Sequence, residues 1–196
     1  MIEKLVIASG NPGKIREIAE MLAPLGLEVV PQSELGVPEA DEPHNTFIEN
    51  ALAKARQASR LTGLPALADD SGICVDALDG APGVRSAHFA GVPRSDERNN
   101  RYLLTRLAGQ HNRRAHYYCV MVLSRNGQDP RPLIGEGEWY GEILDRPRGT
   151  GGFGYDPLFF DPRLGMSGGE LDPVRKNQVS HRAKALAAVV ARLRQT

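Results

Sequence analysis

The sequence has no long hydrophobic run and little cysteine. No stretch approaches the roughly 18 apolar residues that a membrane-spanning helix needs. The first residues, MIEKLVIASGN, contain neither the apolar region nor the cleavage site of a signal peptide. Two distant cysteines, Cys74 and Cys119, form neither a disulfide framework nor a zinc-binding pattern. These absences argue against membrane and disulfide-rich secreted classes, and we expect a soluble, cytoplasmic protein without a membrane partner.

An excess of charge of either sign is absent as well. The 24 Lys and Arg residues balance 24 Asp and Glu residues, so the formal net charge is zero. A general basic surface for nucleic acid is therefore not favoured, and we expect no nucleic-acid partner. The 196 residues, of which 41% are hydrophobic and 24% charged, are typical of a globular protein with one good core.

Hydrophobic periodicity predicts alternating strands and helices. The chain shows no internal repeat, and Thr46 with Glu49 forms a capping box at the start of one helix. This order of elements predicts one α/β domain over residues 1–196 with a mixed sheet. Strands are expected at 4–9, 27–31 and 64–68, a hairpin at 114–124 and 133–144, and helices at 13–26, from 46, at 95–109 and from 180.

Two adjacent aspartates, Asp69 and Asp70, follow the third predicted strand in the segment LADDSG. A polar turn at the end of a strand would explain this pair, and so would a metal and proton-transfer site. The acidic segment EADEP, with Glu39, Asp41 and Glu42, precedes the second helix. It is equally consistent with a solvated loop and with a source of metal ligands, because divalent metals such as Mg²⁺ prefer carboxylate oxygens.

The segment SGNPGK, residues 9–14, leads from the first strand into the first helix. Helix starts present free backbone N–H groups and the positive end of the helix dipole, so they suit phosphate. The segment is not a Walker A loop, because its glycines are too close together and Ile15 replaces the metal-binding Ser or Thr. A tight strand-to-helix turn explains the same residues equally well.

Lys54 lies on the apolar face of the second predicted helix. At about 100° per residue its direction falls within about 40° of Phe47. A lysine in that place either extends its ammonium to water or meets an anion.

The start of the last helix carries an unusual set of cations. Ser180 is a suitable N-cap, and His181 and Arg182 occupy the first two helical positions, with Lys176 four residues before the cap. Cations there oppose the helix dipole, at a cost of roughly 0.3–1 kcal/mol each when exposed. A bound anion would reverse the sign of that interaction, although two surface cations after a cap are equally common.

The segment GTGGFGYDP, residues 149–157, combines glycines with aromatic residues. So many glycines favour a loop whose backbone approaches a ligand closely. Phe153 and Tyr155 are suited to stacking on a flat base, and the neighbouring backbone amides are suited to reading its edge. A glycine-rich hairpin is the structural alternative. Together with the preceding features, this segment completes the parts of a nucleoside triphosphate site with a divalent metal.

Six motifs occur in a family-specific order: SGNPGK, TFIENALAKA, ADDSG, GAPGVRSAHFAG, GTGGFGYDPLF and SHRAKAL. In this order and spacing the chain resembles the inosine triphosphate pyrophosphatase family, from about residue 4 to residue 193. The resemblance implies a single elongated α/β domain with two lobes, a central mixed sheet and an active-site cleft between the lobes. It also implies a homodimer that depends on Mg²⁺.

The resemblance further implies roles for individual residues. Asp70 corresponds to the proton acceptor, and Glu42 and Asp70 correspond to the metal ligands, although Asp41 remains an alternative to Glu42. Lys14, Lys54 and Asp69 complete the catalytic set. The substrate-binding set is Ser9, Gly10, Asn11, Pro12, Gly13, Lys14, Ser71, Phe153, Gly154, Tyr155, Asp156, Lys176, His181 and Arg182.

The implied reaction is hydrolysis of non-standard purine nucleoside triphosphates, ITP, dITP and XTP, to the monophosphate and pyrophosphate. Such an enzyme keeps deaminated purines out of DNA and RNA. Water attacks the α-phosphorus, Lys14 and Lys54 stabilise the developing charge, and Asp69 raises the proton affinity of Asp70 by like-charge repulsion. Two alternatives remain, a pyrophosphatase for other modified nucleotides and a purine-nucleotide sensor without turnover. The presence of both Asp70 and Glu42 argues against the sensor, because a sensor needs no general base.

Overall fold

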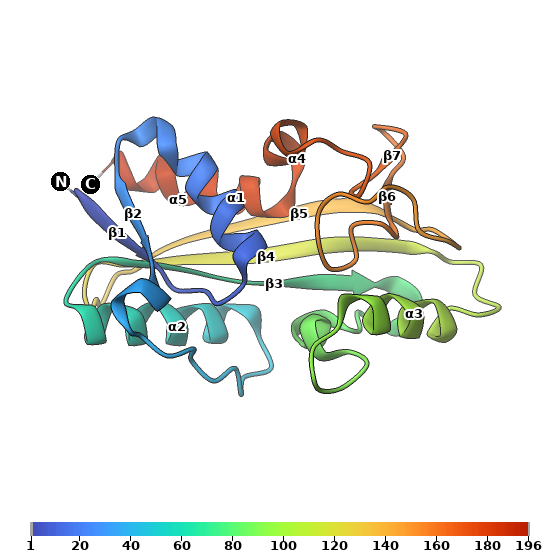
Figure 1. Cartoon of the computed structure of the whole chain (residues 1–196), viewed down its shortest axis with the longest axis horizontal. Coiled ribbons are helices and arrows are strands. Elements are labelled where there is room, and N and C mark those ends of the chain that lie inside the picture. Colours follow the sequence, from blue (N-terminus) through green and yellow to red (C-terminus); the bar gives the residue numbers. More distant parts are fainter. Residues whose placement is uncertain (1, 196) are drawn as a thin grey trace. The chain divides into compact units, whose positions relative to one another are not determined.

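The computed structural model describes residues 2–195 (Figure 1). Its strands form a seven-stranded sheet in the order β2-β1-β3-β4-β5-β6-β7. β1 pairs in parallel with β2 and β3, whereas β6 pairs antiparallel with β5 and β7, so the sheet is mixed. The strands are β1 (Lys4–Ile7), β2 (Glu28–Pro31), β3 (Ala66–Val75), β4 (Arg114–Ser124), β5 (Leu133–Ile143), β6 (Phe159–Asp161) and β7 (Met166–Ser167). The predicted α/β class with a mixed sheet is confirmed.

The chain gathers into two compact units. The first contains the residues up to Asp70, Cys119–Gly137 and the segment from His181, and the second contains Ser71–Tyr118 and Glu138–Ser180. β3, β4 and β5 contribute residues to both. The α-helices are α1 (Pro12–Leu22), α2 (Phe47–Thr62), α3 (Asp96–Arg106), α4 (Pro173–Val179) and α5 (His181–Leu193). That residues 1–196 act as one domain stays a prediction.

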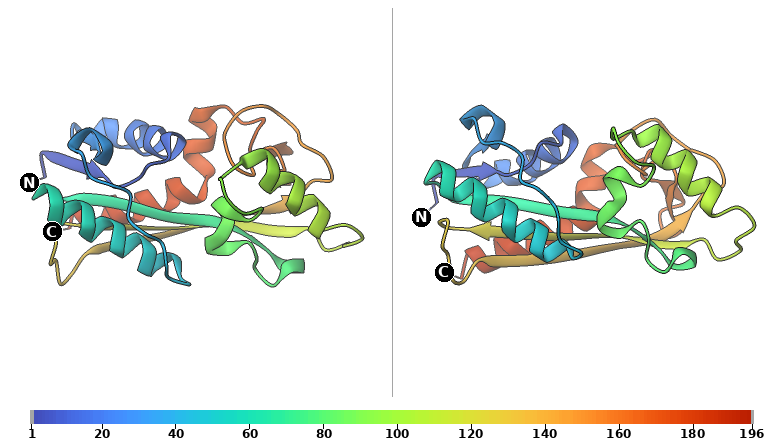
Figure 2. Two further views of the ribbon diagram at one scale, coloured as in Figure 1. Left: turned by 60° about the horizontal axis from the view of Figure 1, so that its bottom comes forward. Right: turned by 90° about the horizontal axis from the view of Figure 1, so that it is seen from below.

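Helices cover both faces of the sheet in the first unit. α1 and α5 lie on one face and α2 lies on the other, as the views of Figures 1 and 2 show. The main core of this unit forms between the sheet and the α1/α5 layer, with Ile18, Leu67 and Leu186 among its buried members. The face of α2 toward the sheet is made of small residues, because Ala51, Ala55 and Ala58 are all buried.

α5 approaches β5 closely because glycines line that strand. A Cβ atom added to Gly135 would lie 2.2 Å from the Ala185 carbonyl oxygen, and one added to Gly137 would lie 2.1 Å from that of His181. No side chain fits at such distances. The two glycines therefore allow the first turns of α5 to pack directly on the strand, which brings His181 and Arg182 into the buried interior.

The second unit has its own core. Leu103 of α3 and Leu107, just after the end of that helix, pack with residues of the strands: Tyr117, Trp139 and Phe159. The indole N–H of Trp139 donates to a buried carboxylate, Asp161, at 2.8 Å, so its polar atom has a partner within the core.

β3 extends further than the sequence predicts. The segment 64–68 was expected to end at the aspartates, but the strand continues through LADDSG to Val75. Asp69 and Asp70 are nearly inaccessible, with exposed fractions of 1% and 3%. The interpretation of LADDSG as a polar turn is therefore wrong, because both carboxylates lie inside a sheet strand and find partners there.

The helix starts follow the sequence closely. The Thr46 side chain accepts from the Glu49 N–H and donates to its carboxylate at 2.5 Å, which confirms the predicted capping box. The Ser95 side chain caps α3 by accepting from the Arg98 N–H at 3.3 Å. Ser180, in extended conformation, follows α4 and precedes α5, so Lys176 lies in a short helix of its own.

No helix within residues 2–195 is long and apolar enough to cross a membrane.

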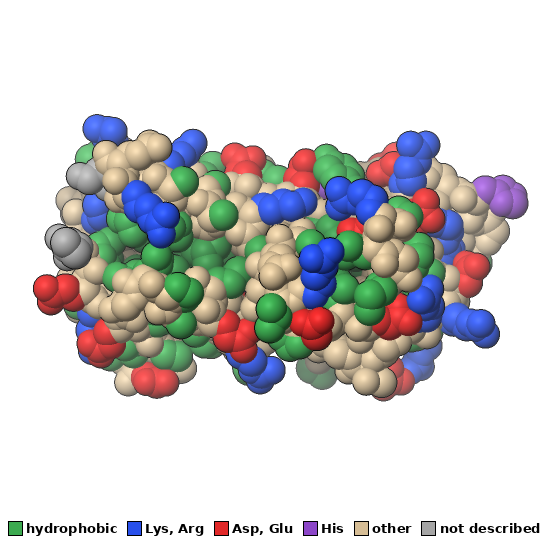
Figure 3. Space-filling model, turned by 90° about the horizontal axis from the view of Figure 1, so that it is seen from above, with side chains coloured by type: hydrophobic (Ala, Val, Ile, Leu, Met, Phe, Trp, Pro, Cys, Tyr) green, Lys and Arg blue, Asp and Glu red, His purple; other side chains and the backbone are tan. Residues whose placement is uncertain are grey.

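The face that carries α1 and α5 shows hydrophobic side chains gathered over the first unit, with charged side chains around them (Figure 3). Partly buried residues of this layer include Ile15, Met21 and Val190.

Candidate functional site

The two aspartates of β3 lie on opposite faces of the sheet. Successive side chains of a strand alternate between faces, so Asp69 shares a face with Leu67, which packs in the α1/α5 core. Asp70 therefore faces α2. Like charges that are adjacent in sequence are thus separated by the sheet, and each carboxylate has its own set of partners.

Asp69 is the centre of a buried ionic network. Its Oδ2 lies 3.0 Å from Lys14 Nζ and accepts hydrogen bonds from Arg182 at 3.1 and 3.3 Å. The remaining terminal nitrogen of Arg182 donates to Glu17 Oε2 at 2.5 Å. Burial alone would raise the pKa of Asp69, but the charges of Lys14 and Arg182 outweigh it and lower that pKa far below its usual range. Asp69 therefore stays ionised.

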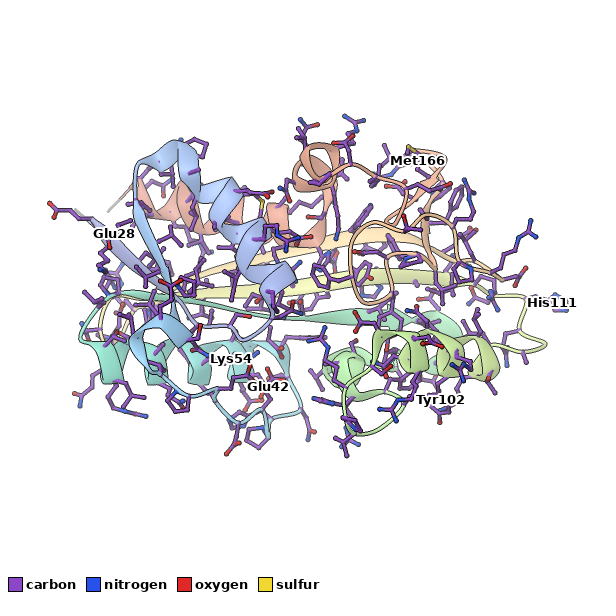
Figure 4. The ribbon with its side chains drawn as sticks, in the orientation of Figure 1. Glu28, Glu42, Lys54, Tyr102, His111 and Met166 are labelled. Atoms are coloured by element: carbon purple, nitrogen blue, oxygen red, sulfur yellow. The ribbon has the colours of Figure 1, made fainter. Side chains whose placement is uncertain are left out.

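Asp70 faces a different set of partners on α2. Its Oδ2 accepts from Asn50 Nδ2 at 3.1 Å, and its Oδ1 lies 3.2 Å from Lys54 Nζ. Lys54 also pairs with Glu42, and Figure 4 shows these two side chains pointing toward one another. Burial alone would lower the pKa of the Lys54 ammonium, but the charges of Asp70, Glu42 and Asp69 raise it. The lysine on the apolar face thus meets anions and does not extend to water.

The electrostatic surroundings of Asp70 differ from those of Asp69. Burial raises the pKa of Asp70, Lys54 and Lys14 oppose that rise, and the charge of Glu42 adds to it, so that the net shift is upward. The like charge that matters is Glu42. Asp69 was predicted to raise the proton affinity of Asp70, but its own charge is balanced by cations on the other face of the sheet.

A divalent metal fits the pair Glu42 and Asp70. Their carboxylates converge on one ammonium group, that of Lys54, so the position already attracts a cation. Within residues 2–195 no three His, Cys, Asp or Glu side chains form a metal-binding group. Two carboxylates nevertheless suit Mg²⁺, which usually keeps several waters and binds through one or two carboxylates together with substrate phosphates. Asp41 is exposed on the same loop.

In the strand-to-helix segment 9–14, side chains of the segment already accept hydrogen bonds from several of its backbone N–H groups. Asn11 caps α1 and accepts from the N–H groups of Gly13 and Lys14 at 2.9 and 3.3 Å. The Asn11 N–H donates to Ser9 Oγ at 3.2 Å. Pro12 has no N–H, and Gly10 lies against the side chain of Glu39. A phosphate here would therefore be held first by the ammonium of Lys14 and by the polar side chains.

The glycine and aromatic segment lies in the second unit and is internally bonded. The Phe153 N–H donates to Asp156 Oδ2 at 2.8 Å, and the same oxygen accepts from Lys176 Nζ at 2.6 Å. Lys176 Nζ also lies 4.7 Å from the centre of the Phe153 ring. Tyr155 is buried and donates its hydroxyl hydrogen to the Ser86 carbonyl, so Phe153, which is half-buried, is the more accessible ring of the segment.

The structure distributes the predicted residues between the two units. Ser71 follows Asp70 in β3 and is half-buried. His181 and Arg182, expected as surface cations or as an anion site, are buried, and Arg182 meets the carboxylates of Asp69 and Glu17. The anion that the helix start was expected to attract is thus supplied by the chain itself.

Sequence reasoning missed two residues of the network. Asn50 is buried and joins the Asp70 carboxylate to the backbone of His44, in the loop that follows Glu42. Its spacing of four residues from Lys54 placed it on the same helix face, which was the available signal. Glu17 had a weaker signal, a carboxylate three residues after Lys14.

The whole chain matches known proteins. Residues 5–192 match the model of the Ham1 family. The chain belongs to the Ham1 family. The dITP/XTP pyrophosphatase of Nitrosomonas europaea is 66% identical over 98% of this chain and 95% of its own length. That of Ralstonia nicotianae is 61% identical over 98% of both chains.

Solved Ham1 structures share the fold. A HAM1 protein from Coxiella burnetii superposes with a TM-score of 0.91 at 44% identity, over 100% of both chains. The family match and this similarity confirm the resemblance that the six sequence motifs indicated.

Proposed function

We propose that this Ham1 protein hydrolyses non-standard purine nucleoside triphosphates, dITP, ITP and XTP, to the monophosphate and pyrophosphate. Relatives at 61–66% identity that carry the name dITP/XTP pyrophosphatase support this activity. Such a reaction removes deaminated purines from the nucleotide pool before they enter DNA or RNA.

The arrangement around Asp70 carries the proposal. A buried carboxylate with a raised pKa, held by Asn50 and flanked by the ammonium of Lys54, is suited to accept the proton of an attacking water. Asp69 is not suited to this role, because its cationic partners lower its pKa and make it a weak proton acceptor. We infer that Asp70 is the general base and that Asp69 positions Lys14.

Lys14 and Lys54 provide positive charge on the two faces of β3. Phosphoryl transfer depends mainly on positioning and on stabilisation of negative charge. We infer that Lys14, with Ser9 and Asn11, binds the triphosphate, and that Gly10, Pro12 and Gly13 complete this loop. Lys54 keeps the carboxylates of the opposite face in place.

We infer that Glu42 and Asp70 hold Mg²⁺. When bound, this ion neutralises the charge of the departing pyrophosphate. Asn50 fixes one Asp70 oxygen, so the other oxygen faces Lys54 and Glu42. Asp70 thereby offers its Oδ1 toward the position of the cation, while its Oδ2 is held by the neutral amide of Asn50.

The second unit supplies the purine contacts in this proposal. Phe153, which is half-buried, offers its ring for stacking. The Lys176 ammonium beside it, which is buried and paired with Asp156, is the proposed partner of a 6-oxo group. A donor left facing the amino group of adenine would be unpaired, which costs about 1–3 kcal/mol. This penalty would select hypoxanthine and xanthine over adenine. Ser71, Asp156 and His181 complete the proposed contacts.

We further propose that the protein works as a homodimer in the cytoplasm. The supporting observations are the family resemblance and the neutral overall charge. Neither nucleic acid nor membrane is a partner in this proposal.

A product assay with several nucleotides tests the activity. The purified protein should release pyrophosphate from ITP, dITP and XTP with Mg²⁺, and much less from ATP and GTP. In ¹⁸O-labelled water the label should enter the nucleoside monophosphate, because water attacks the α-phosphorus.

Other products would contradict the proposal. Release of inorganic phosphate would indicate a phosphatase. Pyrophosphate release from other modified nucleotides, without turnover of ITP or XTP, would favour the first alternative. Tight binding of ITP without any turnover would indicate a nucleotide sensor.

A further inference from the structure

The peptide backbone of Gly154 is held on both sides by α3. Its N–H donates to Asp96 Oδ2 at 2.7 Å, and its carbonyl oxygen accepts from Asn100 Nδ2 at 2.7 Å. Asp96 and Asn100 are four residues apart on one helix, so their side chains lie on the same face. All three residues belong to the second unit.

The two side chains are themselves fixed within α3. Asn100 Nδ2 also donates to the backbone carbonyl of Asp96 at 2.8 Å, which anchors the carboxamide to the first turn of the helix. Asp96 follows the N-cap Ser95, where a carboxylate interacts favourably with the helix dipole. Asn100 is thus anchored within the helix, and Asp96, whose side chain is 37% exposed and also meets Arg94, supplies the second contact.

Gly154 needs such a support. It has a positive φ of 62°, a conformation that other residues rarely adopt, and an added Cβ would meet nothing within 4 Å, so no packed neighbour restrains it on that side. A glycine-rich segment loses much conformational entropy when it binds a ligand. Two hydrogen bonds from α3 remove part of that freedom before any ligand arrives, which is a form of preorganisation.

The support acts on the residue next to it. Phe153 precedes Gly154, and its ring lies 4.7 Å from Lys176 Nζ. The Gly154 N–H belongs to the peptide unit that joins Phe153 to Gly154, so its hydrogen bond to Asp96 also fixes the backbone that follows Phe153. We propose that Asp96 and Asn100 are positioning residues for purine binding. They keep the Phe153 ring at its place beside the Lys176 ammonium. This inference rests on the proposed function, in which Phe153 and Lys176 contact the base.

Two product fragments separate base binding from phosphate binding. Inosine monophosphate (IMP) carries the base, and inorganic pyrophosphate does not, so calorimetry with each reports one part of the site. Asn100→Asp keeps the size of the side chain but turns a donor toward the Gly154 carbonyl into an acceptor. Asp96→Ala removes the acceptor of the Gly154 N–H. Loss of one such hydrogen bond should weaken IMP binding about threefold to tenfold, with pyrophosphate binding unchanged.

Steady-state kinetics give a second readout. KM for ITP should rise by a similar factor in both variants while kcat stays within about twofold of wild type, because Asp70 and Lys14 are untouched. Asp96→Asn retains an acceptor oxygen and should restore IMP binding. Glu97→Ala is the matched control, because Glu97 lies on the same helix turn and pairs only with exposed Arg101 among the described residues.

Three outcomes would overturn the inference. The first is unchanged IMP binding in Asn100→Asp and Asp96→Ala, both with wild-type melting temperatures. The second is an equal loss of IMP and pyrophosphate binding, which would show that α3 only supports the fold. A wild-type protein that does not bind IMP would contradict the proposed function itself, and the inference with it. If Asp96→Ala does not fold, Asn100→Asp and Asp96→Asn still decide the question.

Discussion

Arg182 in α5 donates two hydrogen bonds to a single oxygen of Asp69, 113 residues earlier in the chain. The same oxygen pairs with Lys14 of α1, and Glu17 of α1 completes the network. Three elements of the first unit are therefore joined by buried charges. Removing one member of such a network leaves the others unpaired in the interior, which typically costs about 3–5 kcal/mol.

Asp69→Asn should therefore lower the free energy of unfolding at pH 7 by about 3 kcal/mol. Burial would raise the pKa of Asp69, but Lys14 and Arg182 lower it below that of an unfolded aspartate, about 3.9. The stabilisation is fully present above that unfolded pKa and is lost as the pH falls toward the lower folded-state pKa. Denaturant unfolding of both proteins should show a difference that narrows below about pH 4. A difference that is constant with pH would assign the loss to packing.

Asp70→Asn should fold normally and lose turnover. The substitution is nearly isosteric and removes a carboxylate whose burial is unfavourable, so the melting temperature should not fall. Loss of a general base should lower kcat for ITP about 10²-fold or more. Binding of ITP should persist. Near-wild-type turnover in this variant would remove Asp70 from the mechanism, and Asp69→Asn serves as the comparison that loses stability.

Lys54→Gln should move the acid limb of the pH profile. Burial and the charge of Glu42 raise the pKa of Asp70, whereas Lys54 lowers it. Without Lys54 that pKa rises, so the base loses its proton only at higher pH. The acid limb of kcat/KM should shift upward in pH, and Glu42→Gln should shift it downward. If neither variant moves the limb, a different group controls it.

Activity should require Mg²⁺ and depend on Glu42 more than on Asp41. Excess chelator should abolish pyrophosphate release and added Mg²⁺ should restore it, while Ca²⁺, with longer bonds and looser geometry, should support little. Glu42→Gln should raise the Mg²⁺ concentration needed for half-maximal rate more than Asp41→Asn does, since both residues are exposed but Glu42 pairs with Lys54 beside Asp70. The reverse order would make Asp41 the ligand.

Local sequence signals predicted the starts of α1, α2, α3 and α5 and most strands, but they did not predict α4. The signals at the starts of α2 and α3 are short-range: Thr46 acts with Glu49, and Ser95 is followed by an acidic turn. The formation of these helix starts therefore does not depend on the rest of the fold. The length of β3, by contrast, could not be predicted from local signals. Two aspartates in a strand are costly unless partners arrive from elsewhere, and those partners, on α1, α2 and α5, are distant in sequence.

The candidate site was predicted as a set of residues but not as an arrangement. The positions of Asp70, Lys54 and Glu42 were predicted from motifs, and the structure brings them together. Asn50 and Glu17 were missed, because a neutral amide or one more surface-type glutamate carries no distinctive signal until the fold provides its partner.

The alternation of β3 makes two identical neighbours chemically unlike. Asp69 is a permanent charge and Asp70 is a group that can take up a proton, yet no difference of residue type distinguishes them. What distinguishes them is the face of the sheet on which each side chain lies, because successive residues of a strand alternate between the two faces. Deleting one residue just before the pair, with the register of the earlier strand residues kept, would move Asp70 to the face of Arg182 and Lys14 and present Ser71 to α2. Lys54 and Asn50 would then face the Ser71 hydroxyl in place of the Asp70 carboxylate, and Asp69 would move to the α2 face two positions before it. The proton acceptor would be displaced from its place beside Lys54.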